Sequence, residues 1–390
     1  MLPISAQENS LAPFYLQAAL ILAAAAEVDM MRLGSFVLAV ALAAAAIVLF
    51  WPAGPAYGGE QVIAPAYTVL PPISHDNLTV FPVVASSARG GNLFLTLDEG
   101  LASGQVTVGE AGAVRPLVRG PHPHPVPQSY GDVNRLVLIN NSDRPLLLLA
   151  GEIVTGGKQD RVIAADRIVA PHSDPVDLGV FCVDPGRWTG QAKFGSTAVQ
   201  MAQPTVRKQA MAAKDQQRVW DSVRSAQESV AVAAGAPAAA TGTTSYARVM
   251  QNEAVQSKVD SVAAPVQRSY EGLPRELRAR NAVGVVVSVN GRIVWADIFS
   301  GPELLEKYWP KLVRSYATEA LTSGAWIAKP PSRAAAQSFI NNLSGSHQEI
   351  EIEPGLYRHT EITGPGFRAF TLSSLLPKTG YDVHISKMAE

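Results

Sequence analysis

Residues 283–298 read VGVVVSVNGRIVWADI, and this stretch decides the fold. Two apolar, β-branched runs flank Asn290-Gly291, a dipeptide that favours the tight turn of a β-hairpin because Gly tolerates the positive φ that the turn requires. Ser300 then stands three residues before Glu303, the spacing of an N-cap and its capping box at the start of a helix. The stretch therefore predicts a hairpin followed directly by a helix.

The helix should run from Pro302 to about Thr322. Large side chains recur along it every three or four positions, at Leu305, Tyr308, Leu312 and Tyr316. This period places them on one face, which we expect to be buried.

Short apolar segments separated by Gly, Pro, Ser and Asn surround this unit on both sides and predict strands. Before it lie residues 77–84, 92–97, 105–108, 135–140, 145–150 and 176–183, with a hairpin-like turn expected at 141–144. After it lie residues 348–353, 356–361, 367–372 and 383–386, which complete the same β unit or form a small second one.

Between residues 196 and 280 the pattern changes to a helical period. Two apolar stripes recur at that spacing, one at Val219, Val223, Ala226 and Val230 and the other at Val255, Val259, Val262 and Val266. We expect an antiparallel helical pair joined by a mobile loop at 233–244, with stripes that need a partner surface.

Together these patterns predict an α+β protein with an antiparallel β-sandwich or barrel-like core, an inserted helical pair and the hairpin–helix unit. We divide the chain into an N-terminal apolar segment (1–56), a β-rich core (57–195), the helical pair with its mobile loop (196–280), the hairpin plus helix that completes the core (281–325) and a C-terminal segment of short strands (326–390).

The N-terminal segment indicates where the chain is sent. Residues 33–51 carry no charge, follow Met30, Met31 and Arg32, and precede small residues near position 56, as in a secretory signal. A start at Met30 or Met31 would leave residues 1–29 untranslated. We expect an exported protein, periplasmic or secreted, that is either cleaved near residue 57 or held by residues 33–51 as a single membrane anchor.

The composition excludes some classes. Lys and Arg number 32 against 33 Asp and Glu, whereas a general nucleic-acid binder needs a surplus of cations to neutralise phosphates. We therefore expect no nucleic-acid partner. The chain has one cysteine, Cys182, which excludes an internal disulfide and a cysteine-based zinc cluster.

The densest polar segment, residues 151–161, follows an apolar strand and reads GEIVTGGKQDR. Its two adjacent glycines let the backbone turn sharply and offer N–H groups to an anion. The spacing differs from that of a phosphate-binding P-loop, and a hairpin turn with solvated charges is the alternative. The ligand-binding candidates here are Gly156, Gly157, Lys158, Gln159 and Arg161.

A second polar turn, residues 182–188, contributes Arg187 as a fork of donors and Trp188 as a stacking surface. The alternative is a strand-end turn with the Trp packed inward. If both turns line one pocket, Lys158 and Arg161 should converge with Arg187 and Trp188. Cys182 shares a strand face with aliphatic residues, which indicates a buried, unreactive thiol.

The catalytic candidates are Glu152 and Asp160 as acid or base and His172 as an acid–base group. The alternative for His172 is an ordinary surface-loop histidine. Alternating prolines keep His122 and His124 in an extended segment without a fixed chelating geometry. We therefore predict no metal site and no cofactor.

Several of these motifs, taken in order, resemble one family: residues 77–83, the 151–161 segment, the 182–188 turn and the hairpin–helix from 284 to 316. It is the ADP-ribosylglycohydrolase- and rhodanese-phosphatase-associated protein domain, a domain of unknown function. The resemblance covers roughly residues 75–325. It implies a link to ADP-ribose or phosphate-ester metabolism and carries over no catalytic residue.

Three functional hypotheses follow. The leading one is an exported binding module that holds a small anionic or sugar-like ligand, or a protein partner, near residues 156–161 and 187–188. The second is a hydrolase of a glycosidic or phosphoester bond with Glu152 or Asp160 as acid or base, for which the resemblance implies an ADP-ribose-like substrate. The third is a structural envelope or interaction protein whose helical pair is an interaction arm.

Overall fold

The computed structural model describes residues 66–89, 92–111, 134–188, 194–195, 200–273, 275, 282–324, 328–377 and 379–390. These residues belong to one compact unit. The predicted N-terminal segment lies outside the described residues, and so do His122 and His124. Among the described helices, none combines the length and the apolar character that crossing a membrane requires.

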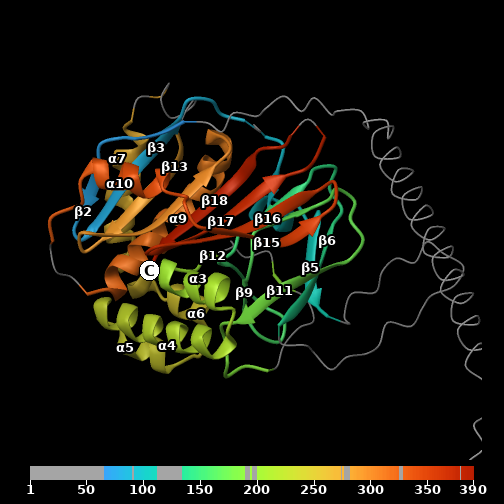
Figure 1. Ribbon diagram of the computed structural model, residues 1–390. Helices are drawn as coiled ribbons and strands as arrows, with labels where there is room; N and C mark the ends of the chain where they lie inside the picture. Colours follow the sequence, from blue (N-terminus) through green and yellow to red (C-terminus); the bar gives the residue numbers. More distant parts are fainter. Residues whose placement is uncertain are drawn as a thin grey trace, which may run out of the picture. The chain divides into compact units, whose positions relative to one another are not determined.

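The predicted hairpin lies in the middle of a nine-stranded antiparallel sheet (Figure 1). The strands follow the order β1-β3-β13-β14-β18-β17-β16-β15, and β2 pairs with β3. Their bounds are β1 (Tyr67–Val69), β2 (Ile73–His75), β3 (Leu78–Ala85), β13 (Ala282–Val289), β14 (Arg292–Phe299), β15 (Ser346–Glu353), β16 (Tyr357–Gly364), β17 (Phe367–Ser374) and β18 (Asp382–Ala389). Because β18 pairs with β14, the C-terminal strands complete the same sheet as the hairpin.

The turn between β13 and β14 is the predicted one. Asn290 and Gly291 both have positive φ, 51° and 73°. A side chain at Gly291 would place its Cβ 2.7 Å from the carbonyl oxygen of Lys329, so the position requires glycine for space as well as for φ. The Asn290 side-chain amide donates to the carbonyl of Gly324 at 3.1 Å, which ties the turn to the end of the following helix.

That helix, α9 (Pro302–Thr322), has the predicted bounds, and its four predicted core residues are all buried. The predicted cap is wrong: the N-cap is Gly301, and the Ser300 hydroxyl has no partner among the described residues. Ser300 instead continues the strand, since its N–H donates to the carbonyl of Val383 at 3.0 Å. The first turn of α9 therefore has no side-chain cap.

Helices cover both faces of the large sheet. On one face, α9 packs on β13 and on α7 (Glu253–Glu271). On the other, α10 (Arg333–Asn341) packs on β1. Along β14 the side chains alternate between the two layers, with Trp295 and Phe299 in the α9 layer and Ala296 and Ile298 in the α10 layer.

The other strands form two smaller sheets, and the fold is α+β with mostly antiparallel pairing. A six-stranded, curled half-barrel sheet has the order β12-β8-β9-β11-β6-β5, and a three-stranded sheet has the order β10-β7-β4. Their bounds are β4 (Leu95–Thr96), β5 (Val106–Glu110), β6 (Arg135–Asn140), β7 (Leu146–Leu148), β8 (Glu152–Val154), β9 (Arg161–Ile163), β10 (Arg167–Val169), β11 (Val176–Cys182) and β12 (Gln200–Met201).

Two strand predictions in this part are corrected. Residues 92–97 hold only the short β4, because Thr96 and Glu99 form a capping box that starts the helix α2 (Leu97–Ala102). The segments β6 and β7 are not a hairpin, since they belong to different sheets. The Asn140 side chain donates to the carbonyls of Arg144 at 2.8 Å and Ala170 at 3.0 Å, which redirects the chain between the sheets.

Both helices predicted between residues 196 and 280 are present. The helices with described bounds here are α3 (Pro204–Lys208), the π-helix η1 (Gln209–Ala213), α4 (Gln216–Ala233), α5 (Pro237–Thr241), α6 (Tyr246–Met250) and α7. The segment expected to be a loop, 233–244, therefore contains α5. The α4 stripe packs on Ile153 and Val162 of the half-barrel sheet, and the α7 stripe packs in the α9 layer. The chain itself thus supplies the partner surface for both stripes.

A buried network of charges joins the sheets. The Arg207 guanidinium of α3 donates to both carboxylate oxygens of Asp297 in β14, at 2.8 and 3.0 Å. The His384 ring in β18 lies between two carboxylates, with Nδ1 2.6 Å from Asp166 and Nε2 3.2 Å from Asp297. All four side chains are fully buried. Gly151 makes room for this network, because a Cβ there would lie 2.5 Å from Cγ of Arg207.

Candidate functional site

The two polar turns lie close together, the arrangement that we expected if both line one pocket. The turn between β8 and β9 carries Gly156 and Gly157, both with positive φ (117° and 52°). Arg187 follows β11 and reaches this turn, with its Nη1 3.1 Å from the carbonyl oxygen of Gly157. The ammonium of Lys158 lies 5.2 Å from the ring centroid of Trp188, which is 47% exposed.

Arg187 is nevertheless engaged within the protein. Its Nη2 lies 2.7 Å from the buried carboxylate of Asp160, and its Nε lies 2.5 Å from that of Asp184. With the carbonyls of Gly156 and Gly157, the guanidinium has four protein acceptors. We therefore correct the expectation that Arg187 offers its donors to an anion: its guanidinium has a structural role and joins the two turns.

The neighbouring candidates also have internal contacts. The Lys158 N–H donates to Glu110 at 2.6 Å, and the carboxylate of Asp160 accepts from Ser245 at 2.5 Å as well as from Arg187. The side chains of Gln159 and Arg161 are buried. These contacts tie the turn to the rest of the fold and leave little of it facing solvent.

The structure favours a surface-loop histidine for His172 and a buried, unreactive thiol for Cys182. The His172 ring is exposed and lies 2.7 Å from the exposed carboxylate of Asp143, as a surface-loop histidine would. The Cys182 thiol is buried, and burial raises its pKa, so little of it is the reactive thiolate. The described residues contain no group of three or more His, Cys, Asp or Glu placed to hold a metal ion.

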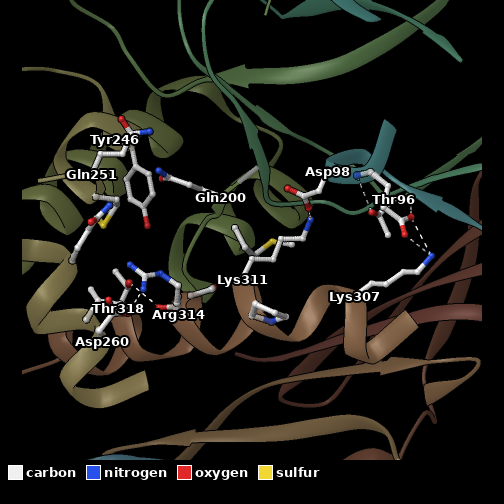
Figure 2. Close-up of a pocket in the computed structure, with 17 residues that line it drawn as sticks. Thr96, Asp98, Gln200, Tyr246, Gln251, Asp260, Lys307, Lys311, Arg314 and Thr318 are labelled. Carbon is white, nitrogen blue, oxygen red and sulfur yellow. Dashed lines mark hydrogen bonds and ion pairs between the residues drawn. The ribbon is translucent and has the colours of Figure 1, made fainter. Parts of the chain in front are cut away.

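A cleft lined by both polar and apolar side chains lies between α9 and α7 (Figure 2). Its volume is about 610 Å³, within the range of small-molecule sites. One wall is the polar face of α9, and the opposite wall comes from α6 and α7. The start of α2 and the strand β12 contribute the remaining side chains.

Three cations follow one another along the cleft face of α9, and each is paired with a carboxylate. Lys307 lies 2.9 Å from Glu99, Lys311 contacts Asp98, and Arg314 contacts Asp260. Figure 2 shows the Asp98–Lys311 pair near Thr96 and the Asp260–Arg314 pair near Thr318, with both cations on α9. These side chains are buried or half-exposed, so the pairs form the polar lining of the cleft.

Glu152 lies behind this lining. One carboxylate oxygen accepts from Lys311 at 2.6 Å and the other from the N–H of Leu149 at 2.7 Å. Burial raises the pKa of Glu152 although Lys311 opposes this, and the carboxylates of Glu152 and Asp98 raise the pKa of Lys311 against the effect of burial. Glu152 therefore orients the Lys311 ammonium, and Lys311 is the group of this pair that lines the cleft.

Sequence reasoning missed the cleft. It predicted only the buried apolar face of α9. On another face of the same helix, Lys307, Lys311 and Arg314 also recur every three or four residues. That spacing was the available signal. The carboxylates that pair with these cations belong to α2 and α7, far away in the sequence, and no local pattern indicated the pairing.

A comparison with protein families matches residues 66–388 to the ARG and Rhodanese-Phosphatase-superfamily-associated Protein domain. The match extends past residue 325, where the resemblance seen in the sequence ends, and takes in all four C-terminal strands. No curated protein and no solved structure gives a significant match. Since the family model spans most of the chain, this protein belongs to the ARG and Rhodanese-Phosphatase-superfamily-associated Protein domain family.

Proposed function

We propose that this protein is a binding module that holds a small, uncharged, sugar-like ligand in the cleft between α7 and α9. The observation that carries the proposal is the pairing of charges in the cleft. The three cations Lys307, Lys311 and Arg314 are balanced by Asp98, Glu99 and Asp260, and Glu152 adds a further carboxylate behind them.

This balance disfavours an anionic ligand. An entering phosphate or carboxylate would have to displace a carboxylate that already holds the cation, at the cost of a repulsion between like charges. A neutral ligand with hydroxyl groups meets no such cost, because each ion pair still offers lone pairs and N–H groups at its exposed side. The charge arrangement thus narrows the expected ligand from anionic or sugar-like to sugar-like.

The remaining lining suits the same ligand. Gln200, Gln251 and Gln256 line the cleft, and each amide offers two donors and one acceptor, as a hydroxyl-rich ligand requires. Met201 and Val259 add apolar surface that can pack on the C–H face of a sugar ring. Donors, acceptors and apolar patches thus occur together in one cleft.

The alternatives have less support. A hydrolase acting through Glu152 or Asp160 needs a carboxyl group that reaches its substrate, but neither of these residues lines the cleft and both carboxylates are engaged by protein donors. An interaction arm needs an uncovered apolar face, whereas the stripes of α4 and α7 are buried against the chain itself. We therefore place ligand binding first.

Neutral mono- and disaccharides should raise the melting temperature of the protein, because a ligand that binds the folded state stabilises it by mass action. Gln256→Ala should weaken the best saccharide by roughly five- to tenfold through the loss of a hydrogen bond. The control is Gln267→Ala on the same helix, whose amide donates to Glu271 in a solvent-exposed hydrogen bond and does not line the cleft. Stabilisation by sugar phosphates alone would contradict the proposal that the ligand is neutral. Equal effects of Gln256→Ala and Gln267→Ala would contradict the proposal that it binds in the cleft.

We also propose that the module works outside the cytoplasm, on the ground of the uncharged run at 33–51 and the small residues after it. Terminal sequencing of the protein from its native host should find a start near residue 57, or the protein should fractionate with membranes. Full-length protein in the soluble cytoplasmic fraction would contradict export.

A further inference from the structure

A second cavity lies on the other face of the large sheet. It has a volume of about 330 Å³ and sits under the end of α10. Its floor is the α10 side of β14 and β18, where Ile298 pairs with Ile385 and Ala296 pairs with Lys387. Ile340 and Leu343 close it from above. The lining is mostly aliphatic; Tyr67, Asn341 and Lys387 are its members with polar groups.

Lys387 is held firmly in place. Only 2% of the residue is exposed, and its ammonium donates to the carbonyl of Phe339 at 2.6 Å and to that of Asn342. The rings of Phe339 and Phe367 flank it, with the ammonium 4.6 and 3.6 Å from their centroids. Carbonyls at a helix C-terminus attract a cation, so this lysine also caps α10.

The charge of Lys387 is not neutralised by the part of the chain that the structure describes. No carboxylate among those residues forms an ion pair with it, although other buried cations such as Arg207 and Lys311 have one. An ammonium has three N–H donors, and the two carbonyls use two of them. Burial lowers the pKa of Lys387 to about 8, which reflects the cost of a buried cation without a counter-ion.

We propose that this cavity binds an aliphatic carboxylate of medium chain length, whose tail lies on the β14–β18 floor and whose carboxylate pairs with Lys387. The cavity and the unpaired charge point to the same ligand independently. The aliphatic part of the lining packs on the hydrocarbon, and a carboxylate supplies the acceptor and the negative charge that Lys387 lacks. The site is separate from the cleft between α7 and α9 and does not depend on the function proposed for that cleft.

The test compares decanoate with decanol, which has the same tail and no charge. Decanoate should bind saturably and about tenfold or more tightly than decanol, since a hydrogen bond to a charged group is worth more than one to a neutral group. Lys387→Met should abolish this preference while leaving decanol binding within about twofold, because the tail contacts remain. Isothermal titration calorimetry on the full chain measures both ligands.

Two further variants keep the test decisive. Lys208→Met is the matched control, because Lys208 also donates to a backbone carbonyl, that of Ala389 at 2.9 Å, and does not line this cavity. Ala296→Leu fills the floor and should abolish binding of both ligands, even if Lys387→Met fails to fold. Equal affinities for decanoate and decanol, or no saturable binding, would mean that Lys387 only caps α10, and would overturn the proposal.

Discussion

Replacing Arg207 with methionine should lower the free energy of unfolding by about 3–5 kcal/mol, because it removes one of the two cationic partners of a buried carboxylate, and with it both guanidinium hydrogen bonds. Asp297 is fully buried and accepts both guanidinium hydrogen bonds. Arg207→Lys should recover only part of the loss, since an ammonium cannot donate to both oxygens in the same planar geometry. Urea unfolding at pH 7 measures the three proteins.

The control is an ion pair of the same residue types on the surface. Arg135 and Asp177 form it with side chains 53% and 55% exposed. Arg135→Met should cost less than about 1 kcal/mol, because water solvates the remaining carboxylate. If the Arg207 and Arg135 substitutions cost the same, Asp297 is neutralised or hydrated at little cost, and the network does not stabilise the junction between the sheets.

The second large effect is a loss of stability as the pH rises from 6.5 to 9. Burial alone would lower the pKa of His384, but the carboxylates of Asp166 and Asp297 outweigh it and raise this pKa to about 9. A group whose pKa is raised by folding stabilises the fold fully below its unfolded pKa, near 6.5, and loses this contribution as the pH passes the folded value. The shift corresponds to about 3 kcal/mol.

The two carboxylates of the network set the lower limit of the pH range in which the network stabilises the fold. Asp166 and Asp297 have lowered pKa values, so their contribution is present above pH 4 and is lost as acid protonates them. His384→Asn should be less stable than the parent protein below pH 6.5 and should lack the step between pH 6.5 and 9. Other groups that titrate there, such as Lys387, act in both proteins and cancel in the difference.

Denaturation midpoints measured at intervals from pH 5 to 9.5 give the two profiles. His172→Asn is the matched histidine control, because the ring is exposed and its partner Asp143 lies at the surface. This variant should keep the step of the parent protein. A His384→Asn profile that runs parallel to that of the parent would show that His384 is not protonated at neutral pH in the folded protein.

Much of the fold was predictable because its signals are local. The turn at Asn290-Gly291 follows from the φ angles that these residues tolerate, and the bounds of α9 follow from its apolar period. The prediction of Ser300 as N-cap was wrong because the capping pattern was also local, while Ser300 is held by strand pairing with Val383. The N-cap is instead Gly301, one residue later than that pattern indicates.

The site was predictable only in part. Arg187 reaches the turn at Gly156 and Gly157, because both lie at the ends of strands in one sheet, and the strand ends could be read from the sequence. It could not show that Asp160 and Asp184 already bind the guanidinium, since acidic residues are common and their partners depend on packing. The same limit hid the cleft on α9, whose carboxylates come from α2 and α7.

By itself the sequence determined the hairpin, the helical periods, the family and the burial of Cys182, because each rests on turn chemistry, on spacing or on motifs along the chain. Only the tertiary structure decided which charges meet. Lys311 pairs with Glu152 across 159 positions, and Arg207 pairs with Asp297 across 90. The energy of a charge depends on its burial and on the distance to its partner, and both are set when distant segments pack together.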